Sequence, residues 1–173
     1  MSLPTVLAFV APKGFREEEL FVPLECWRDR LDVVVGSTRR GVARGMQGRT
    51  HGIDHTLAEL SGREFDAVVV IGGDGAPKHL WDDPALCAAL RRHFARGSIV
   101  GGICYGVVAL ARAGVLAGHR ATVYPDRRAE LEIGRGGALL TADSLVSDGN
   151  IVTARGPSDA MLLAQAILTR LGA

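Results

Sequence analysis

Short apolar runs recur along the chain and alternate with longer segments in which apolar residues follow a helical period. Continuous apolar runs are typical of strands that are buried on both faces, as in a parallel sheet. We therefore predict five core strands. They cover Val6 to Ala11, Asp32 to Val35, Ala67 to Ile71, Ser98 to Ile103 and Ile151 to Ala154.

Three segments carry helix signals. In the first, acidic residues precede apolar residues at helical spacing, and Pro23 predicts a kink. In the other two, a proline stands at the first helical position. The predicted helices run from near Phe15 to Leu31, from Asp83–Pro84 to Gly97, and from Gly156–Pro157 to Leu171–Gly172.

This alternation of strands and helices predicts an α/β fold, namely a flavodoxin-like three-layer α/β/α sandwich with a mostly parallel sheet. A length of 173 residues suits one domain, which we expect to span residues 1–173. Two stretches, 38–56 and 122–141, are rich in glycine and charge and have weak periodicity. We predict loops and hairpins there.

Charge and cysteine content narrow the class of protein. The formal net charge is +1, with 20 basic and 19 acidic residues interspersed, so we expect neither a nucleic-acid nor a membrane surface. The start of the chain has no basic leader, and no uncharged run is long enough to span a bilayer, so a cytoplasmic protein is expected. The three cysteines, Cys26, Cys87 and Cys104, form no C-x-x-C pair and predict reduced thiols.

Cys104 is the strongest candidate for chemistry. It stands where an apolar strand run turns into an apolar helical run, between Gly102 and Gly106. The resulting G-x-C-x-G pattern is the cysteine counterpart of the nucleophile elbow, in which small flanking residues allow close approach of the backbone. We expect the positive end of the following helix to favour the thiolate and so to lower the pKa of Cys104.

The glutamates of the first predicted helix and the five histidines are the other candidates for chemistry. Any of Glu17, Glu18 and Glu19 can supply a carboxyl with a raised pKa, but acidic residues in a first helical turn are expected in any case. His51 and His55 have metal-ligand spacing only if helical, and Gly52 intervenes, so no metal is expected. The remaining histidines are interpreted as solvated; they are His79, His93 and His119.

Four motifs in order resemble the ThiJ/PfpI superfamily, which has a class I glutamine amidotransferase-like fold. The resemblance covers nearly the whole chain and is greatest to the short single-domain branch that contains the human parkinsonism-linked protein. The motifs are Lys13-Gly-Phe-Arg-Glu-Glu-Glu19, Val70-Ile-Gly-Gly-Asp-Gly75, Gly102-Ile-Cys-Tyr-Gly106 and Ser147-Asp-Gly-Asn-Ile-Val-Thr-Ala-Arg-Gly-Pro157.

The resemblance implies roles for individual residues. Glu19 matches the glutamate whose protonated carboxyl donates a hydrogen bond to the sulfur of Cys104, and these two would be catalytic. Gly72 and Gly73 would let the backbone approach a ligand, and the amides of Gly73 and Tyr105 would form an oxyanion hole. Asp74 is interpreted as a solvated loop residue, with the mouth of the pocket as the alternative.

Two departures from the family pattern limit the chemistry. Peptidase relatives carry histidine directly after the cysteine, where this chain has Tyr105, so proteolysis is not expected. The related branch often has histidine before proline on a later loop, where this chain has Tyr124. A phenol is a poor base at neutral pH, although it can donate a hydrogen bond to a bound carbonyl.

By resemblance, we expect a cofactor-free glyoxalase or deglycase that acts on small aldehydes such as methylglyoxal or their adducts, and that forms a homodimer. The first alternative is a non-catalytic oxidative-stress sensor or chaperone in which Cys104 is oxidised; an isocyanide hydratase is less favoured. An arginine cluster is interpreted as a solvated loop, with contact to an anionic substrate or a dimer mate as alternatives. Its members are Arg39, Arg40, Arg44 and Arg49.

Overall fold

A seven-stranded sheet forms the middle layer of the molecule in the computed structural model, which describes residues 2–173. The strand order is β11-β12-β8-β7-β1-β3-β6, and every neighbouring pair is parallel except β11 with β12. The strands are β1 Thr5–Phe9, β3 Asp32–Ser37, β6 His55–Thr56, β7 Ala67–Val70, β8 Ile99–Ile103, β11 Leu145–Asp148 and β12 Ile151–Ala154.

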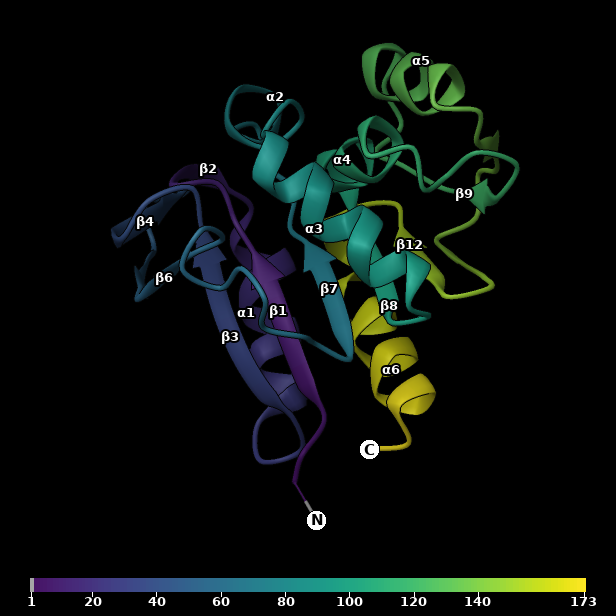
Figure 1. The fold of residues 1–173 in the computed structure, drawn as a ribbon. Coiled ribbons are helices and arrows are strands. Elements are labelled where there is room, and N and C mark those ends of the chain that lie inside the picture. The colour runs from purple at the N-terminus through teal and green to yellow at the C-terminus, as the bar shows by residue number, and fades with distance from the viewer. Residues whose placement is uncertain (1) are drawn as a thin grey trace.

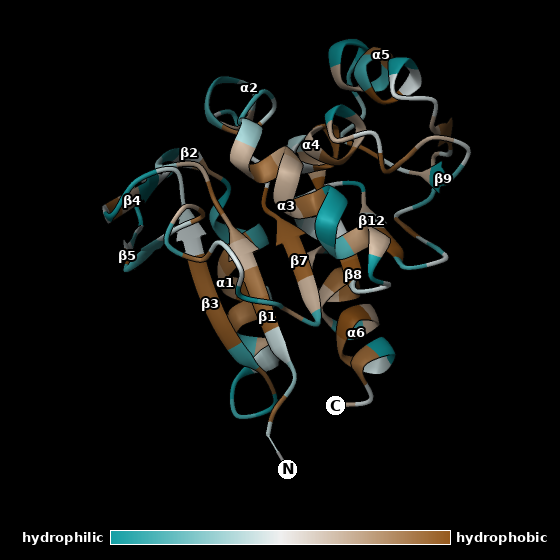
Figure 2. Ribbon diagram, viewed as in Figure 1, coloured by the Kyte–Doolittle hydropathy of each residue, from teal (hydrophilic) through white to brown (hydrophobic). Residues whose placement is uncertain are grey.

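All five predicted strands lie in this sheet, which confirms the sequence prediction of a mostly parallel α/β sandwich. Strands β7, β8 and β12 are buried along their whole length. Figure 2 shows these strands as the apolar middle of the molecule, with polar colour concentrated on the helices and loops. Apolar residues at consecutive positions are therefore explained by helices that cover both faces.

Helices form the two outer layers (Figure 1). One face packs against α1 Glu17–Trp27 and α6 Ala160–Leu171, which are joined by a hydrogen bond of 3.0 Å from Trp27 Nε1 to the carbonyl of Ala164. The other face packs against α3 and α4, with α5 outside α4. These helices and the shorter turns are α2 Ala76–His79, α3 Pro84–Ala95, α4 Val107–Arg112, α5 Arg127–Arg135, η1 Cys104–Gly106 and η2 Pro157–Asp159.

The predicted helix starts agree closely with the structure. Asp83 caps α3, because its side chain accepts a hydrogen bond of 2.7 Å from the amide of Leu86. Helix α6 ends at Gly172, which adopts a left-handed conformation with φ of 69°. Helix α1 contains Pro23 but ends at Trp27, four residues before the predicted end at Leu31. Among residues 2–173, no helix combines the length and apolar composition needed to cross a bilayer.

The segment 38–56 contains a hairpin, in line with the prediction. Its strands β4 Gly41–Gly45 and β5 Thr50–Ile53 are antiparallel, and β2 Lys13–Phe15 runs parallel to β4. This small sheet stands beside the carboxyl end of β1 (Figure 1). It forms one wall of the region into which Cys104 opens.

The segment 122–141 was wrongly predicted to consist of loops and hairpins, because it contains helix α5. Asp126 caps this helix by accepting a hydrogen bond of 2.8 Å from the amide of Ala129. Only Ala129 and Ile133 are buried, so the apolar stripe is too narrow to stand out among charged residues. Two short strands flank the helix, β9 Arg120–Ala121 and β10 Leu139–Leu140.

The prediction of a solvated His93 was also wrong, because this side chain is 1% exposed. Its Nε2 accepts a hydrogen bond of 3.2 Å from the amide of Phe65, and its Nδ1 lies 2.8 Å from the carbonyl of Ala89. Both contacts are satisfied by a neutral ring that donates from Nδ1. Burial lowers the pKa of His93, which stabilises the same neutral form.

Candidate active site

Cys104 follows β8 directly and occupies a sharp turn. Its φ angle of 58° is one that non-glycine residues rarely adopt. A Cβ on Gly106 would lie 2.3 Å from the carbonyl oxygen of Val70, and one on Gly102 would lie 3.0 Å from Cα of Val107. The flanking glycines therefore allow the elbow to pack against β7 and α4.

Cys104 lines a cavity of about 380 Å³ at the carboxyl edge of the sheet. Tyr105, Tyr124 and Gly73 form its walls together with Arg16 and Met46. The cysteine itself is only 4% exposed, so little of its surface can be reached from the cavity.

Glu19 lies beside Cys104 and is completely buried. Its Oε2 accepts a hydrogen bond of 2.8 Å from the amide of Gly72. Its Oε1 is buried without a partner that satisfies hydrogen-bond geometry, although the thiol of Cys104 is near enough to influence the carboxyl. Burial raises the pKa of Glu19 to about 8, so the carboxyl is mainly protonated at neutral pH.

The other two glutamates of the first helical turn are held elsewhere. Glu18 pairs with Arg16 through contacts of 2.7 and 3.0 Å, and this hydrogen bonding lowers the pKa of Glu18. Glu17 accepts a hydrogen bond of 2.6 Å from the amide of Gln47. Glu19 is thus the member of the triplet that approaches the thiol, as the resemblance implies.

The environment of Cys104 differs from the expected one. Burial, followed by the carboxylate charge of Glu19, raises the pKa of Cys104, while the amides of Tyr105 and Gly73 act in the opposite direction. Helix α4 has only six residues, so its dipole does not offset the loss of hydration. Because each negative charge opposes the other, Glu19 and Cys104 hold at most one charge between them near neutral pH.

Tyr105 is fixed by contacts on both its side chain and its backbone. Its hydroxyl donates a hydrogen bond to the carboxylate of Asp126, which raises the pKa of Tyr105 to about 12. Its carbonyl accepts a hydrogen bond of 2.8 Å from Trp81 Nε1. The phenol proton is therefore directed toward Asp126, and the hydroxyl is not a free donor for a ligand.

The structure brings most of the predicted site residues together. Tyr124 is 38% exposed and packs against Tyr105 with ring centroids 5.3 Å apart. Asp74 lines the mouth of the cavity, which was the less favoured interpretation. Gly72 was expected to face a bound ligand, but it does not line the cavity. Its backbone amide instead donates a hydrogen bond to Glu19.

Four residues of the site were missed by sequence reasoning. Arg16, Met46 and Pro157 line the cavity, and Asp126 holds the hydroxyl of Tyr105. The cap signal of Asp126 was present in the sequence, whereas no local pattern placed Met46 near Cys104. Within residues 2–173, no cluster of three His, Cys, Asp or Glu side chains is arranged to bind a metal.

Comparisons with known proteins agree with this geometry. The family model described as the DJ-1/PfpI family matches residues 4–170. The chain is 37% identical over 164 residues to an uncharacterized protein of Methanocaldococcus jannaschii, covering 94% of this chain and 80% of that protein. It is 35% identical over 146 residues to a deglycase of Pyrococcus abyssi, covering 84% of this chain and 86% of that protein.

A solved structure shows the same fold. The ThiJ/PfpI domain protein from Brachyspira murdochii superimposes with a TM-score of 0.92 at 31% identity, covering 99% of this chain and 98% of that chain. The family match extends over nearly the whole sequence and includes both Cys104 and Glu19. The chain belongs to the DJ-1/PfpI family.

Proposed function

We propose that the protein is a cofactor-independent, thiol-dependent enzyme that acts on small reactive aldehydes such as methylglyoxal, or on their adducts with amines and thiols. The observation that carries the proposal is the buried carboxyl of Glu19 beside the thiol of Cys104. A relative with 35% identity bears the name deglycase, which is consistent with this activity.

The first step needs a thiolate. When the pair of Glu19 and Cys104 carries one negative charge, transfer of the proton to the carboxyl leaves a thiolate next to a neutral donor. The sulfur then attacks the aldehyde carbon of methylglyoxal, forming a bond from Sγ to C1. The carbonyl oxygen takes the proton from the carboxyl of Glu19, so the product is a hemithioacetal beside a Glu19 carboxylate.

The second step is an internal oxidation and reduction. The carboxylate of Glu19 removes the proton from C1 and returns it to C2, so C1 is oxidised and C2 is reduced. The result is a thioester on Cys104, and water cleaves its C1–S bond to give lactate and the free thiol. No outside oxidant or reductant is needed.

The backbone supports the charge that develops on oxygen. The backbone amides of Gly73 and Tyr105 both act to lower the pKa of Cys104, which supports them as donors close to the sulfur. An oxygen on the carbon attached to that sulfur would lie near the same donors. A cavity of about 380 Å³ favours small carbonyl compounds over larger ones.

A test follows lactate production from methylglyoxal. Wild-type protein is expected to give steady turnover, Cys104→Ala to abolish it, and Glu19→Gln to reduce it about 100-fold or more. If the wild type gives no turnover but peroxide adds the mass of oxygen atoms to Cys104, the proposal is wrong and the protein is an oxidation sensor.

A further inference from the structure

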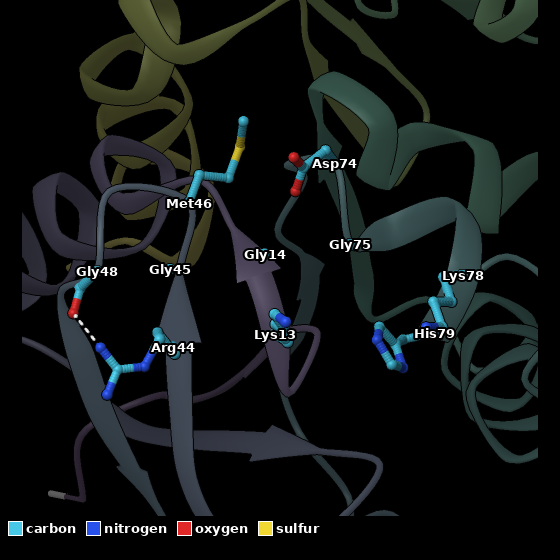
Figure 3. A pocket seen from close by; sticks show the side chains of 10 residues that line it. All are labelled: Lys13, Gly14, Arg44, Gly45, Met46, Gly48, Asp74, Gly75, Lys78 and His79. Carbon is cyan, nitrogen blue, oxygen red and sulfur yellow. Dashed lines mark hydrogen bonds between the residues drawn. The ribbon is translucent and has the colours of Figure 1, made fainter.

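A second cavity, of about 400 Å³, adjoins the cavity of Cys104. The two share a wall made by Met46 and Asp74. Figure 3 shows these two residues at one end, with Lys13 between Arg44 and His79 at the other. A molecule that enters the first cavity can therefore extend past Met46 and Asp74 toward basic side chains.

The basic side chains come from three elements. Lys13 begins β2, Arg44 lies on β4, and Lys78 and His79 end α2. Of the 20 lysine and arginine residues in the chain, only Lys13 and Lys78 are lysines, and both line this cavity. An ammonium group is a compact charge with three donors, which suits phosphate and carboxylate.

These cations lack acidic partners. Lys13 and Arg44 face each other across the pairing of β2 with β4, where like charges are unfavourable. Within the described chain neither residue forms an ion pair, and nor does Lys78, whereas Arg112 pairs with both Asp82 and Glu132. Burial lowers the pKa of His79, and the positive charge of Lys78 acts in the same direction.

We propose that this second cavity binds the anionic group, a phosphate or a carboxylate, of a carrier thiol or amine whose aldehyde adduct reacts at Cys104. The inference rests on the proposed function and specifies its substrate class. The carboxylate of Asp74 at the shared wall repels an anion there. It therefore directs the anion toward Lys13 and Lys78 and the adduct carbon toward Cys104.

The carrier leaves in a balanced exchange. For a thiol carrier, a bond forms between Sγ of Cys104 and C1 of the adduct while the bond from C1 to the carrier sulfur breaks. The proton lost by Cys104 is taken up by the carrier sulfur. The enzyme-bound hemithioacetal then proceeds to lactate as above, so the carrier is released unchanged.

The test uses two matched pairs of thiols, each loaded with methylglyoxal. 4′-Phosphopantetheine and pantetheine differ by a phosphate, and N-acetylcysteine and N-acetylcysteamine differ by a carboxylate. We expect kcat/KM for lactate formation to be about tenfold higher for the anionic member of at least one pair. The pair that shows the preference identifies whether the cavity binds phosphate or carboxylate.

Charge variants locate the effect. Lys13→Gln/Lys78→Gln should bring the anionic and neutral members to within about twofold of each other. Arg91→Gln/Arg92→Gln removes two exposed charges from α3 outside the cavity and should leave the preference unchanged. If the lysine variant keeps the preference, or if neither pair shows one, the inference is overturned.

Binding separates this inference from the proposed function. Calorimetry on the wild type should show the anionic member of at least one pair binding about tenfold more tightly than its neutral partner, with the difference shrinking in high salt. Tighter binding without lactate from free methylglyoxal would overturn the proposed function and retain the anion site. Turnover of free methylglyoxal with equal affinities within both pairs would retain the proposed function and overturn the anion site.

Discussion

The carboxyl of Glu19 and the thiol of Cys104 are buried side by side, although one belongs to the first turn of α1 and the other follows β8. The backbone amide of Gly72, two residues after the end of β7, holds the carboxyl by a hydrogen bond to its Oε2. Three elements thus meet at one edge of the sheet. Their meeting gives a pair of acids that hold at most one negative charge between them near neutral pH.

This shared charge predicts the pH dependence of activity. Burial raises the pKa of Glu19 to about 8, so the fraction of sites with one negative charge increases as pH rises toward that value. We expect kcat/KM for methylglyoxal to rise about tenfold per pH unit below that pH and to level off above it. A pH profile of initial lactate rates measures this.

Glu19→Gln should remove the inflection near pH 8, because the amide does not ionise in this range. Glu25→Gln, on the exposed side of the same helix, is the matched control and should keep the wild-type profile. An unchanged inflection in Glu19→Gln would show that another group controls the rate.

The same carboxyl should destabilise the fold at neutral pH. A folded-state pKa raised from 4.5 to about 8 means that the unfolded chain binds fewer protons, so stability is lost as pH rises between these values. Glu19→Gln should increase the free energy of unfolding by about 4 kcal/mol at pH 7.5. The gain should vanish toward pH 4.5.

Urea denaturation of wild type and Glu19→Gln at several pH values measures the difference. The amide oxygen of glutamine can still accept from Gly72, so the variant keeps that contact. A stability difference that does not vary with pH would mean that packing, rather than ionisation, separates the two proteins.

The elbow glycine predicts a large effect on stability. Gly106→Ala would place a Cβ 2.3 Å from the carbonyl oxygen of Val70, which is backbone and has little freedom to move. We expect a loss of about 3 kcal/mol or more, measured by thermal unfolding. Gly134→Ala is the control, because a Cβ there meets nothing within 4 Å, and it should stabilise α5 by about 0.5 to 1 kcal/mol.

If Gly106→Ala yields no folded protein, Gly102→Ala offers a milder change, since its Cβ would lie 3.0 Å from Cα of Val107. Equal stability of Gly102→Ala and the wild type would contradict the tight packing described for the elbow.

Substitution of Tyr105 should have only a small effect on catalysis. Its hydroxyl donates to Asp126 and is not available to a bound carbonyl, so Tyr105→Phe should lower kcat/KM less than about threefold. The lost hydrogen bond should reduce stability by about 1 kcal/mol. Steady-state kinetics and urea denaturation measure both, and a 100-fold loss of kcat/KM would instead make the phenol a catalytic group.

Much of the fold was predictable because burial on both faces leaves a strong local signal. The strand runs and the caps at Asp83 and Gly172 are visible in the sequence itself. Helix α5 was missed because only Ala129 and Ile133 contact the core, and His93 was misjudged because the amide that satisfies it belongs to distant Phe65.

The site was predictable to a lesser extent. Cys104 is marked by a local motif. The choice of Glu19 among three glutamates depended on the family resemblance, because only the packing of α1 against the end of β7 decides which carboxyl reaches the thiol. The expected lowering of the pKa of Cys104 was wrong, because burial raises it. The sequence motif indicates the helix dipole but not the side chains that bury the sulfur. Met46 lies between β4 and β5, and no sequence pattern connects this hairpin with the elbow at Cys104.

Because both lysines of the chain line one cavity, chemical labelling of lysine would place spectroscopic probes at that cavity. Reductive methylation with ¹³C-formaldehyde would place dimethylamino groups on Lys13 and Lys78 as its only lysine side chains. Their two resonances would report on events beside Met46 and Asp74 against a background free of other modified lysines. Occupancy next to the reactive sulfur can thus be followed without altering any residue of the Cys104 cavity.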